Sequence, residues 1–317
     1  MKKALVVGIN HYPKANNLYG CINDAKRVSQ LLKRNGDNSV NFDVKDMYGD
    51  GKPLHITKRA LQYEIKELFA SNCEVALFYF AGHGYADENG GFIMTSECEN
   101  GDDGLPLSVI SNAIQTSKAQ NNIVILDCCQ AGAMGIHSVF GDNSVIPPNT
   151  TFLLACKENQ YSEENNNNGV FTDLFVDAIS GGGANLVGEI SPGSIYSYID
   201  QALGLWQQRP VFKTNVERFI SIRNVRPPIT LENLRRITEF FPNINYEFPL
   251  DSSYEPTSSN ANEDNTRIFS ILQKYNRLNL VVPVGEEHMY YAAINQKSCR
   301  LTPLGVHYWN LVDRERI

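Results

Sequence analysis

Two stretches of the sequence decide the fold: Val75–Gly84 reads VALFYFAGHG, and Asn122–Gly132 reads NIVILDCCQAG. Each begins with a continuous apolar run, which is typical of a strand buried on both faces. Each then ends in a residue that carries chemistry, His83 in the first stretch and Cys129 in the second. Ligands of open parallel sheets bind beyond the carboxyl ends of the strands. We therefore expect these two side chains to face each other at one edge of a sheet.

The rest of the first two-thirds of the chain alternates strand and helix patterns. Further strands are predicted at Lys3–Ile9, Asn41–Tyr48, Thr151–Ala155 and Arg218–Ile222, and helices at Asn23–Asn35, Thr57–Ser71, Ser108–Ser117, Phe171–Ser180 and Ser194–Gln207. Strands that alternate with helices require crossover connections between parallel neighbours. The predicted fold class is therefore α/β, with a mainly parallel six-stranded sheet flanked by helices.

The character of the sequence changes near residue 225, which predicts a core domain at 1–224 and a second module at 225–317. The module is expected to contain a helix at Thr230–Phe241, a flexible segment near 242–265, a helix at Thr266–Leu278, strands at Leu280–Val284 and His288–Ile294, and a last helix after the N-cap Thr302. These elements make a small α+β module, and a winged-helix-like arrangement is one way to combine them.

Composition excludes several classes of function. The formal net charge is −7 and no block of basic residues stands out, which disfavours a nucleic-acid partner. No apolar run approaches the roughly 20 residues that span a bilayer, and the short run after Met1 reads as a strand rather than a signal peptide. Seven cysteines, an odd number at irregular spacing, favour reduced thiols and a cytoplasmic location.

A cysteine beside a histidine is sufficient to form a catalytic thiol nucleophile and its base. A thiol with a pKa near 8.5 is only slightly ionised at neutral pH, and a neighbouring imidazole can take its proton. The glycines around His83 let the chain turn sharply, and they leave the N–H of Gly84 available for a developing oxyanion. The N–H of Cys129 is expected to serve as the second donor.

The ordered motifs resemble those of the metacaspase branch of the caspase-like peptidases. The resemblance rests on the Gly-His-Gly and Asp-x-Cys segments quoted above and on four further motifs: Gly20–Ala25, Ala155-Cys156, Gln160–Ser162 and Gly169–Thr172. It covers roughly residues 1–222, and the 46 residues from His83 to Cys129 are close to the interval in caspases. The family pattern implies that Cys129, two residues after Asp127, is the nucleophile and that Cys128 is a buried neighbour.

The same resemblance implies which bond is cleaved. Residues matching Cys21, Asp24 and Asp127 line the substrate pocket of metacaspases, and two carboxylates favour an Arg or Lys side chain before the scissile bond. Asp24 is also expected to cap its helix. Ala81 stands where metacaspases commonly have serine, which leaves the preference between Arg and Lys open.

No cofactor is predicted. Many metacaspases need calcium, however, and Asp102 and Asp103 could either bind it or belong to a solvated loop. Segments 137–149 and 163–169 contain no Lys or Arg, so we expect activation by rearrangement or a partner rather than by self-cleavage. The second module carries 10 basic and 11 acidic residues, which favours a protein partner; a lid or packing extension is the alternative. Two other functions are weighed against a peptidase: an inactive scaffold, and a thiol oxidoreductase using Cys128 and Cys129.

Overall fold

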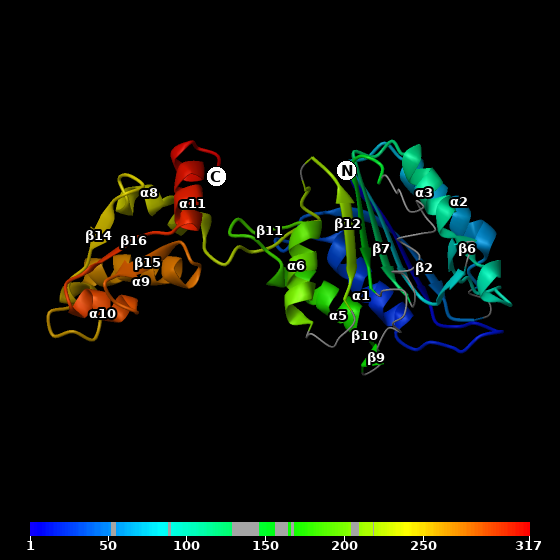
Figure 1. The fold of residues 1–317 in the computed structure, drawn as a ribbon, viewed down its shortest axis with the longest axis horizontal. Helices are drawn as coiled ribbons and strands as arrows, with labels where there is room; N and C mark the ends of the chain where they lie inside the picture. The colour runs from blue at the N-terminus through cyan, green and yellow to red at the C-terminus, as the bar shows by residue number, and fades with distance from the viewer. Residues whose placement is uncertain are drawn as a thin grey trace. The chain divides into compact units, whose positions relative to one another are not determined.

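A computed structural model describes residues 1–51, 55–87, 90–128, 146–155, 164–165, 168–203, 209–217 and 219–317. The chain divides into two compact units, Met1–Arg226 and Pro227–Ile317 (Figure 1). The sequence predicts this change of character at 224/225, two residues earlier.

A six-stranded sheet forms the centre of the first unit, in the order β12-β8-β7-β3-β1-β2. Its strands are β1 (Lys2–Ile9), β2 (Phe42–Gly49), β3 (Val75–Ala81), β7 (Asn121–Asp127), β8 (Thr150–Leu154) and β12 (Val211–Asn215). All neighbours pair in parallel except β12, which runs antiparallel to β8. The prediction of a mainly parallel six-stranded sheet is confirmed.

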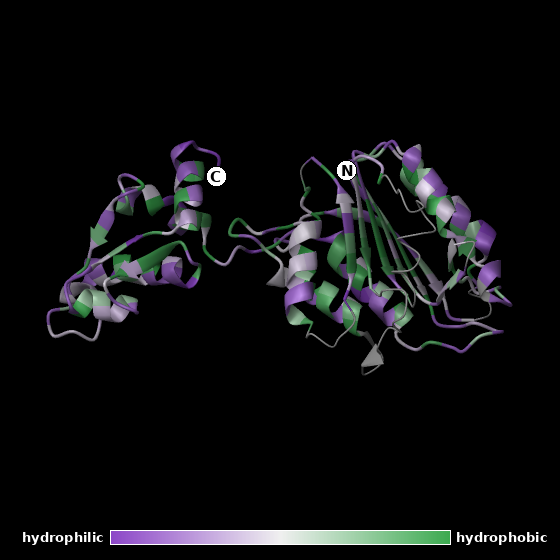
Figure 2. Cartoon of the chain, viewed as in Figure 1, coloured by the Kyte–Doolittle hydropathy of each residue, from purple (hydrophilic) through white to green (hydrophobic). Residues whose placement is uncertain are grey.

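Helices cover both faces of this sheet, as Figure 1 shows. They are α1 (Cys21–Lys33), α2 (Lys58–Ala70), α3 (Leu107–Gln115), α5 (Val170–Asp177) and α6 (Pro192–Ala202). Side chains of β3 alternate between two cores: Phe78 and Phe80 join the core under α2 and α3, whereas Leu77 and Tyr79 join the core under α1, α5 and α6. A strand buried on both faces needs a continuous apolar run, which is the pattern seen in the sequence and in the green central strands of Figure 2.

The predicted sixth strand at Arg218–Ile222 is wrong. The sixth strand of the sheet is β12, whose residues pass from buried at Val211 to exposed at Asn215. An antiparallel edge strand needs little apolar content, so the more apolar segment that follows it was the misleading signal. Ile222 instead leads into the short strand β13 (Arg223–Asn224), which pairs with β11 (Glu189–Ile190).

Small antiparallel sheets lie beside the main one. The strand β4 (Gly84–Asp87) begins directly after His83 and pairs with β5 (Gly90–Ile93), which in turn pairs with β6 (Leu105–Pro106). A two-residue pair, β9 (Glu164–Asn165) and β10 (Asn168–Gly169), immediately precedes α5. In the described part of the chain, no helix is long and apolar enough to cross a membrane.

The second unit combines helices with a three-stranded antiparallel sheet of order β14-β16-β15. Its elements are α7 (Leu231–Arg235), α8 (Ile237–Phe240), β14 (Glu247–Pro249), α9 (Glu263–Arg277), β15 (Val281–Val284), α10 (Met289–Ile294), β16 (Ser298–Leu301) and α11 (Pro303–Asp313). The predicted N-cap of the last helix is confirmed, because the Thr302 side chain accepts a hydrogen bond from the N–H of Gly305. Residues 242–265 hold more structure than expected, since β14 pairs with β16 there.

The strand predicted at His288–Ile294 is wrong, because Met289–Ile294 forms the helix α10. Its buried residues are Met289, Ala292 and Ala293, a helical spacing that the adjacent tyrosines, with their preference for strands, obscured. The third strand is instead Ser298–Leu301, which is too short to stand out in the sequence.

Candidate active site

Three neighbouring strands deliver the candidate residues to one edge of the sheet. Pairing places Gly8 of β1 opposite Ala81 of β3, and Ala81 opposite Asp127 of β7. Ala81, His83 and Asp127 therefore lie at the same carboxyl edge. Cys128 follows as a buried thiol, whereas Cys129 lies outside the described residues. The geometry between His83 and Cys129 accordingly stays a prediction.

The imidazole of His83 is held by a backbone carbonyl that the sequence did not indicate. His83 Nε2 lies 2.7 Å from the carbonyl oxygen of Asn16. A carbonyl oxygen can only accept, so Nε2 carries the proton and donates it to this bond. With the proton on Nε2, Nδ1 is the ring nitrogen that can act as a base.

Tyr12 contacts both the backbone and the imidazole ring of His83. Its hydroxyl accepts a hydrogen bond of 2.9 Å from the backbone N–H of His83, and the centroids of the two rings are 4.7 Å apart. Tyr12 is fully buried, and this burial raises the pKa of its hydroxyl well above 10.0. A side chain at position 82 would have its Cβ 2.5 Å from the Tyr12 hydroxyl, which explains the glycine there.

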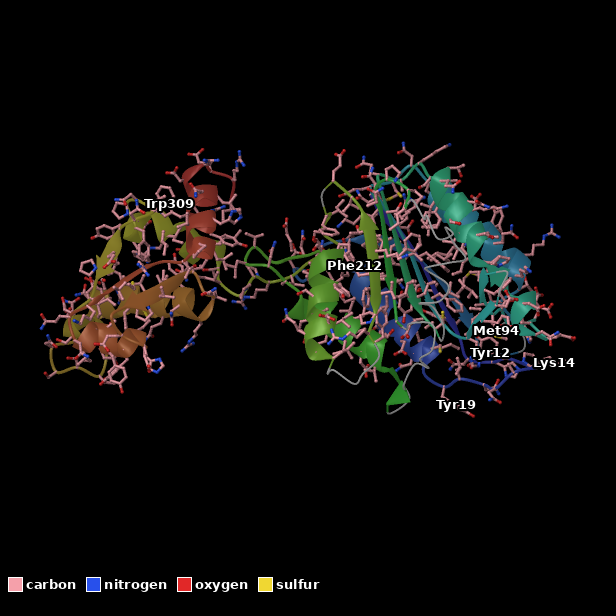
Figure 3. The ribbon with its side chains drawn as sticks, viewed as in Figure 1. Tyr12, Lys14, Tyr19, Met94, Phe212 and Trp309 are labelled. Atoms are coloured by element: carbon pink, nitrogen blue, oxygen red, sulfur yellow. The ribbon has the colours of Figure 1, made fainter. Side chains whose placement is uncertain are left out.

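The backbone after His83 is fixed as well. The carbonyl of His83 accepts a 3.0 Å hydrogen bond from the N–H of Met94, and Gly84 pairs with Ile93 in the small sheet. Figure 3 shows Tyr12 and Met94 together at this edge of the unit, with Tyr19 on the loop that follows Tyr12. The ring and both sides of its backbone are thus held by two separate segments of the chain, residues 12–16 and 93–94.

Asp127 is buried and hydrogen-bonded to a threonine of α5. Thr172 Oγ1 donates to Asp127 Oδ2 over 2.6 Å, and the hydroxyl of Tyr79 lies 2.6 Å from the same threonine oxygen. Burial of Tyr79 raises the pKa of its hydroxyl well above 10.0, and the nearby charges of Asp127 and Asp24 raise it further. The charges of both predicted pocket carboxylates therefore act on one tyrosine hydroxyl, and Asp127 is linked to it through Thr172.

Asp24 lies in the first turn of α1 and is only 2% exposed. The prediction that it caps the helix is wrong: the N-cap is Gly20, and the helix begins at Cys21. Its carboxylate forms an ion pair with Arg27, whose guanidinium also pairs with Asp173 of α5. Cys21, the third predicted pocket residue, is buried at the start of α1 and contributes to the electrostatic environment of Tyr79.

Asp102 and Asp103, the alternative calcium ligands, lie in the short 3-10 helix Gly101–Asp103, and calcium binding there stays an alternative. The Asp103 carboxylate accepts a hydrogen bond from the N–H of Asn100, and the Asp103 backbone carbonyl accepts one from the Lys58 ammonium. Across the described ranges, no group of three or more His, Cys, Asp or Glu side chains could hold a metal ion.

Sequence reasoning missed the residues that support the predicted ones. Thr172 belongs to a motif that was noticed, but nothing in one sequence connects it to Asp127. Tyr12 and Tyr79 read as ordinary core aromatics, because their hydroxyl contacts join segments far apart in the chain. The Asn16 contact has no side-chain signal, since a backbone carbonyl makes it.

Comparison with known proteins gives a family. A family model of the caspase domain matches residues 1–219. Metacaspase-1 of Meyerozyma guilliermondii is 33% identical over 88 residues, covering 26% of this chain and 21% of the relative. Metacaspase-1 of Scheffersomyces stipitis is 35% identical over 89 residues, covering 26% and 21% respectively. The chain thus aligns with only about a fifth of the length of these relatives.

A solved structure supports the fold. Caspase-1 from Spodoptera frugiperda superposes with a TM-score of 0.53 at 13% sequence identity, covering 70% of this chain and 92% of that one. At this level of identity the likeness concerns the fold alone, and it agrees with the central sheet described above.

Proposed function

The chain belongs to the caspase family, and on that premise we propose that it is a cysteine endopeptidase that cleaves protein substrates after Arg or Lys. The observation that carries the proposal is the bond between His83 Nε2 and the Asn16 carbonyl. It leaves Nδ1 as the base of the ring, at the sheet edge where the sequence delivers Cys129 two residues after Asp127.

In the proposed reaction His83 Nδ1 removes the proton of the Cys129 thiol, and the thiolate attacks the carbonyl carbon of the scissile bond. The N–H groups of Gly84 and Cys129 donate to the oxyanion of the tetrahedral intermediate. The intermediate collapses when the C–N bond breaks and the imidazolium gives its proton to the leaving amine. Water, deprotonated by the same imidazole, then hydrolyses the thioester and restores the thiol.

Specificity for a basic side chain is proposed from the two buried carboxylates. Asp24 and Asp127 lie near one tyrosine hydroxyl, and Cys21 and Ala81 lie at the same strand and helix ends. A guanidinium or ammonium group bound there would form charge-assisted hydrogen bonds, which are the stronger class. An acidic side chain in the same pocket would be repelled.

We further propose a reducing compartment such as the cytoplasm, and a protein partner for the second unit. All five cysteines within the described ranges carry free thiols, which is consistent with reducing conditions. The second unit has nearly balanced charge, so a protein surface is favoured over nucleic acid as its contact. We propose that this partner, or a rearrangement of the chain, activates the enzyme without self-cleavage.

The test uses fluorogenic peptides that end in Arg, Lys, Gln or Asp before the reporter group, with and without calcium. Wild type is compared with Cys129→Ala and with Cys128→Ala as the matched neighbour. We expect cleavage after Arg or Lys, lost in Cys129→Ala and retained in Cys128→Ala. Activity that survives Cys129→Ala would remove the nucleophile, and no turnover under any condition would favour the inactive scaffold.

A further inference from the structure

The first turn of α5 contacts one carboxylate of the proposed pocket and is linked to the other through Arg27. Thr172 reaches Asp127 directly, and the next residue, Asp173, reaches Asp24 through Arg27. The helices α1 and α5 lie side by side on the same face of the sheet (Figure 1). Two consecutive residues of one helix are therefore connected to pocket residues that come from two different elements.

The contact of Thr172 has a defined direction. An ionised carboxylate can only accept, so the single hydroxyl hydrogen of Thr172 is donated to Asp127 Oδ2. The short contact with Tyr79 must then have the tyrosine as donor, which agrees with the raised pKa that keeps its hydroxyl protonated. The relay runs from Tyr79 to Thr172 to Asp127. It fixes the rotation of the carboxylate and occupies one lone pair of Oδ2, the oxygen that accepts from the threonine.

Arg27 is shared unequally between two acids. Its Nη1 lies 3.5 Å from Asp24 Oδ1, at the limit of a hydrogen bond, and makes a distinctly shorter contact with Asp173. The Asp24 side chain is 3% exposed, whereas Arg27 and Asp173 are about one-third exposed. Asp173 thus holds the guanidinium toward the surface and away from full pairing with the buried acid.

This arrangement matters because Arg27 carries the same charge as the proposed substrate side chain. A guanidinium that paired fully with Asp24 would compete with the Arg or Lys of a substrate for the same carboxylate. The position of Arg27 is set by the balance between Asp24 and Asp173, and that balance is electrostatic.

We propose that Thr172 and Asp173 are positioning residues that determine specificity: Thr172 orients Asp127, and Asp173 withdraws Arg27 from Asp24. The inference rests on the proposed function, since it assigns a role to residues behind the pocket that binds the basic side chain. Neither residue touches the substrate in this scheme, so each acts through the carboxylate or guanidinium that it holds.

The role proposed for Asp173 predicts that Arg27→Gln suppresses the effect of Asp173→Asn on KM. Asp173→Asn releases Arg27 toward Asp24, so the KM for an Arg peptide should rise about two- to fivefold, the scale of partly exposed ion pairs, with kcat little changed. In the double variant Asp173→Asn/Arg27→Gln the competing cation is gone, and KM should return to within about twofold of wild type. A peptide with Gln before the scissile bond is the control: added as a competitor of Arg-peptide cleavage, its inhibition constant should not respond to either change.

The Thr172 arm is tested by a conservative pair. Thr172→Val keeps the shape of the side chain but removes the hydroxyl, and the loss of a hydrogen bond to a charged acceptor should raise KM for Arg peptides about tenfold or more. Thr172→Ser restores the hydroxyl and should recover most of the wild-type KM. The same variants are compared by circular dichroism, so that a folding defect is recognised.

The outcomes separate this inference from the proposed function. If wild type cleaves no Arg or Lys peptide, the proposed function fails before these variants are compared. If wild type cleaves them but Asp173→Asn changes only kcat, or Arg27→Gln does not suppress it, the Asp173 arm is overturned. If Thr172→Ser is as impaired as Thr172→Val, the hydroxyl is not the operative group and the relay is overturned.

Discussion

The contact between Gly82 and Tyr12 allows a sharp test of how the candidate base is held. A Cβ added at Gly82 would lie 2.5 Å from the Tyr12 hydroxyl oxygen and 2.7 Å from Cζ of Phe80. Real Cβ atoms essentially never come under 3.0 Å of a neighbour, so Gly82→Ala must push the hydroxyl away. The hydroxyl would then lose its 2.9 Å bond from the N–H of His83.

The expected magnitudes follow from these contacts. Gly82→Ala is a case of overpacking, which typically costs about 1–3 kcal/mol of the free energy of unfolding. Tyr12→Phe leaves the His83 N–H without its acceptor, which costs about 1–3 kcal/mol where that group is buried. If the two sites were independent, the double variant would lose about 2–6 kcal/mol. We expect less, because Tyr12→Phe removes the oxygen that the new methyl group meets and Gly82→Ala breaks the bond that Tyr12→Phe deletes.

The double variant should therefore lose only about 1–4 kcal/mol of the free energy of unfolding. This is about 1–2 kcal/mol less than the sum of the two single losses. It should not recover fully, since Phe80 still lies in the path of the methyl group. The free energy of unfolding is measured by urea titration with circular dichroism, and kcat/KM on an Arg peptide follows the position of His83. Tyr63→Phe, at a side chain 59% exposed, is the control. Costs that add within about 0.5 kcal/mol would refute the proposed contact as the means of support.

Three further predictions concern stability. The pKa of Tyr79 is raised in the folded state, so above about pH 10 the unfolded chain loses a proton that the folded chain keeps. The free energy of unfolding should therefore fall as pH rises. Urea titrations at about pH 9 and pH 11 should show a smaller fall for Tyr79→Phe than for wild type. Gly305→Ala would place a Cβ 2.0 Å from the carbonyl oxygen of Leu280, and because backbone must move, we expect a loss of about 3 kcal/mol or more from the second unit, visible as a lower urea midpoint in tryptophan emission. Arg223→Lys should cost about 1–3 kcal/mol, because a buried lysine cannot reproduce both hydrogen bonds that the guanidinium donates to backbone carbonyls, and a thermal shift of less than about 1 °C would contradict this role.

The central fold was predictable because its signals are local and strong. The apolar runs at β1, β3, β7 and β8 are long enough to stand out, and crossover helices between them leave few topologies open. The sixth strand was misplaced for a physical reason: β12 lies at the edge of the sheet and its residues become exposed toward its end, so its composition resembles that of a loop. The helix α10 was misassigned because its two tyrosines favour a strand, while only the spacing of its buried residues reveals the helix.

The sequence predicted the candidate site residues but not the contacts that hold them, and the role of Cys129 as nucleophile stays a prediction. The family resemblance singled out Asp24 and Asp127, and the structure shows that both are buried and that both charges raise the pKa of the Tyr79 hydroxyl. The relay from Tyr79 through Thr172 depends on a contact across 93 residues of sequence. A single sequence contains no signal for such a pair, because either residue alone is an ordinary member of a core.

The support of His83 by Asn16 shows a limit of a different kind. The group that accepts from the imidazole is a carbonyl, so the amino acid at position 16 does not determine its presence; the path of the loop does. That path is closed by Asn10, whose side chain accepts from the N–H of Ile22 and donates to the carbonyl of Tyr19, while its own carbonyl accepts from Leu18. The Asn17 side chain, which accepts from the N–H of Tyr12, fixes the same loop, so the contact to His83 depends on asparagines that carry no catalytic chemistry. A search for catalytic residues by type alone would therefore find His83 and pass over the loop residues that orient it.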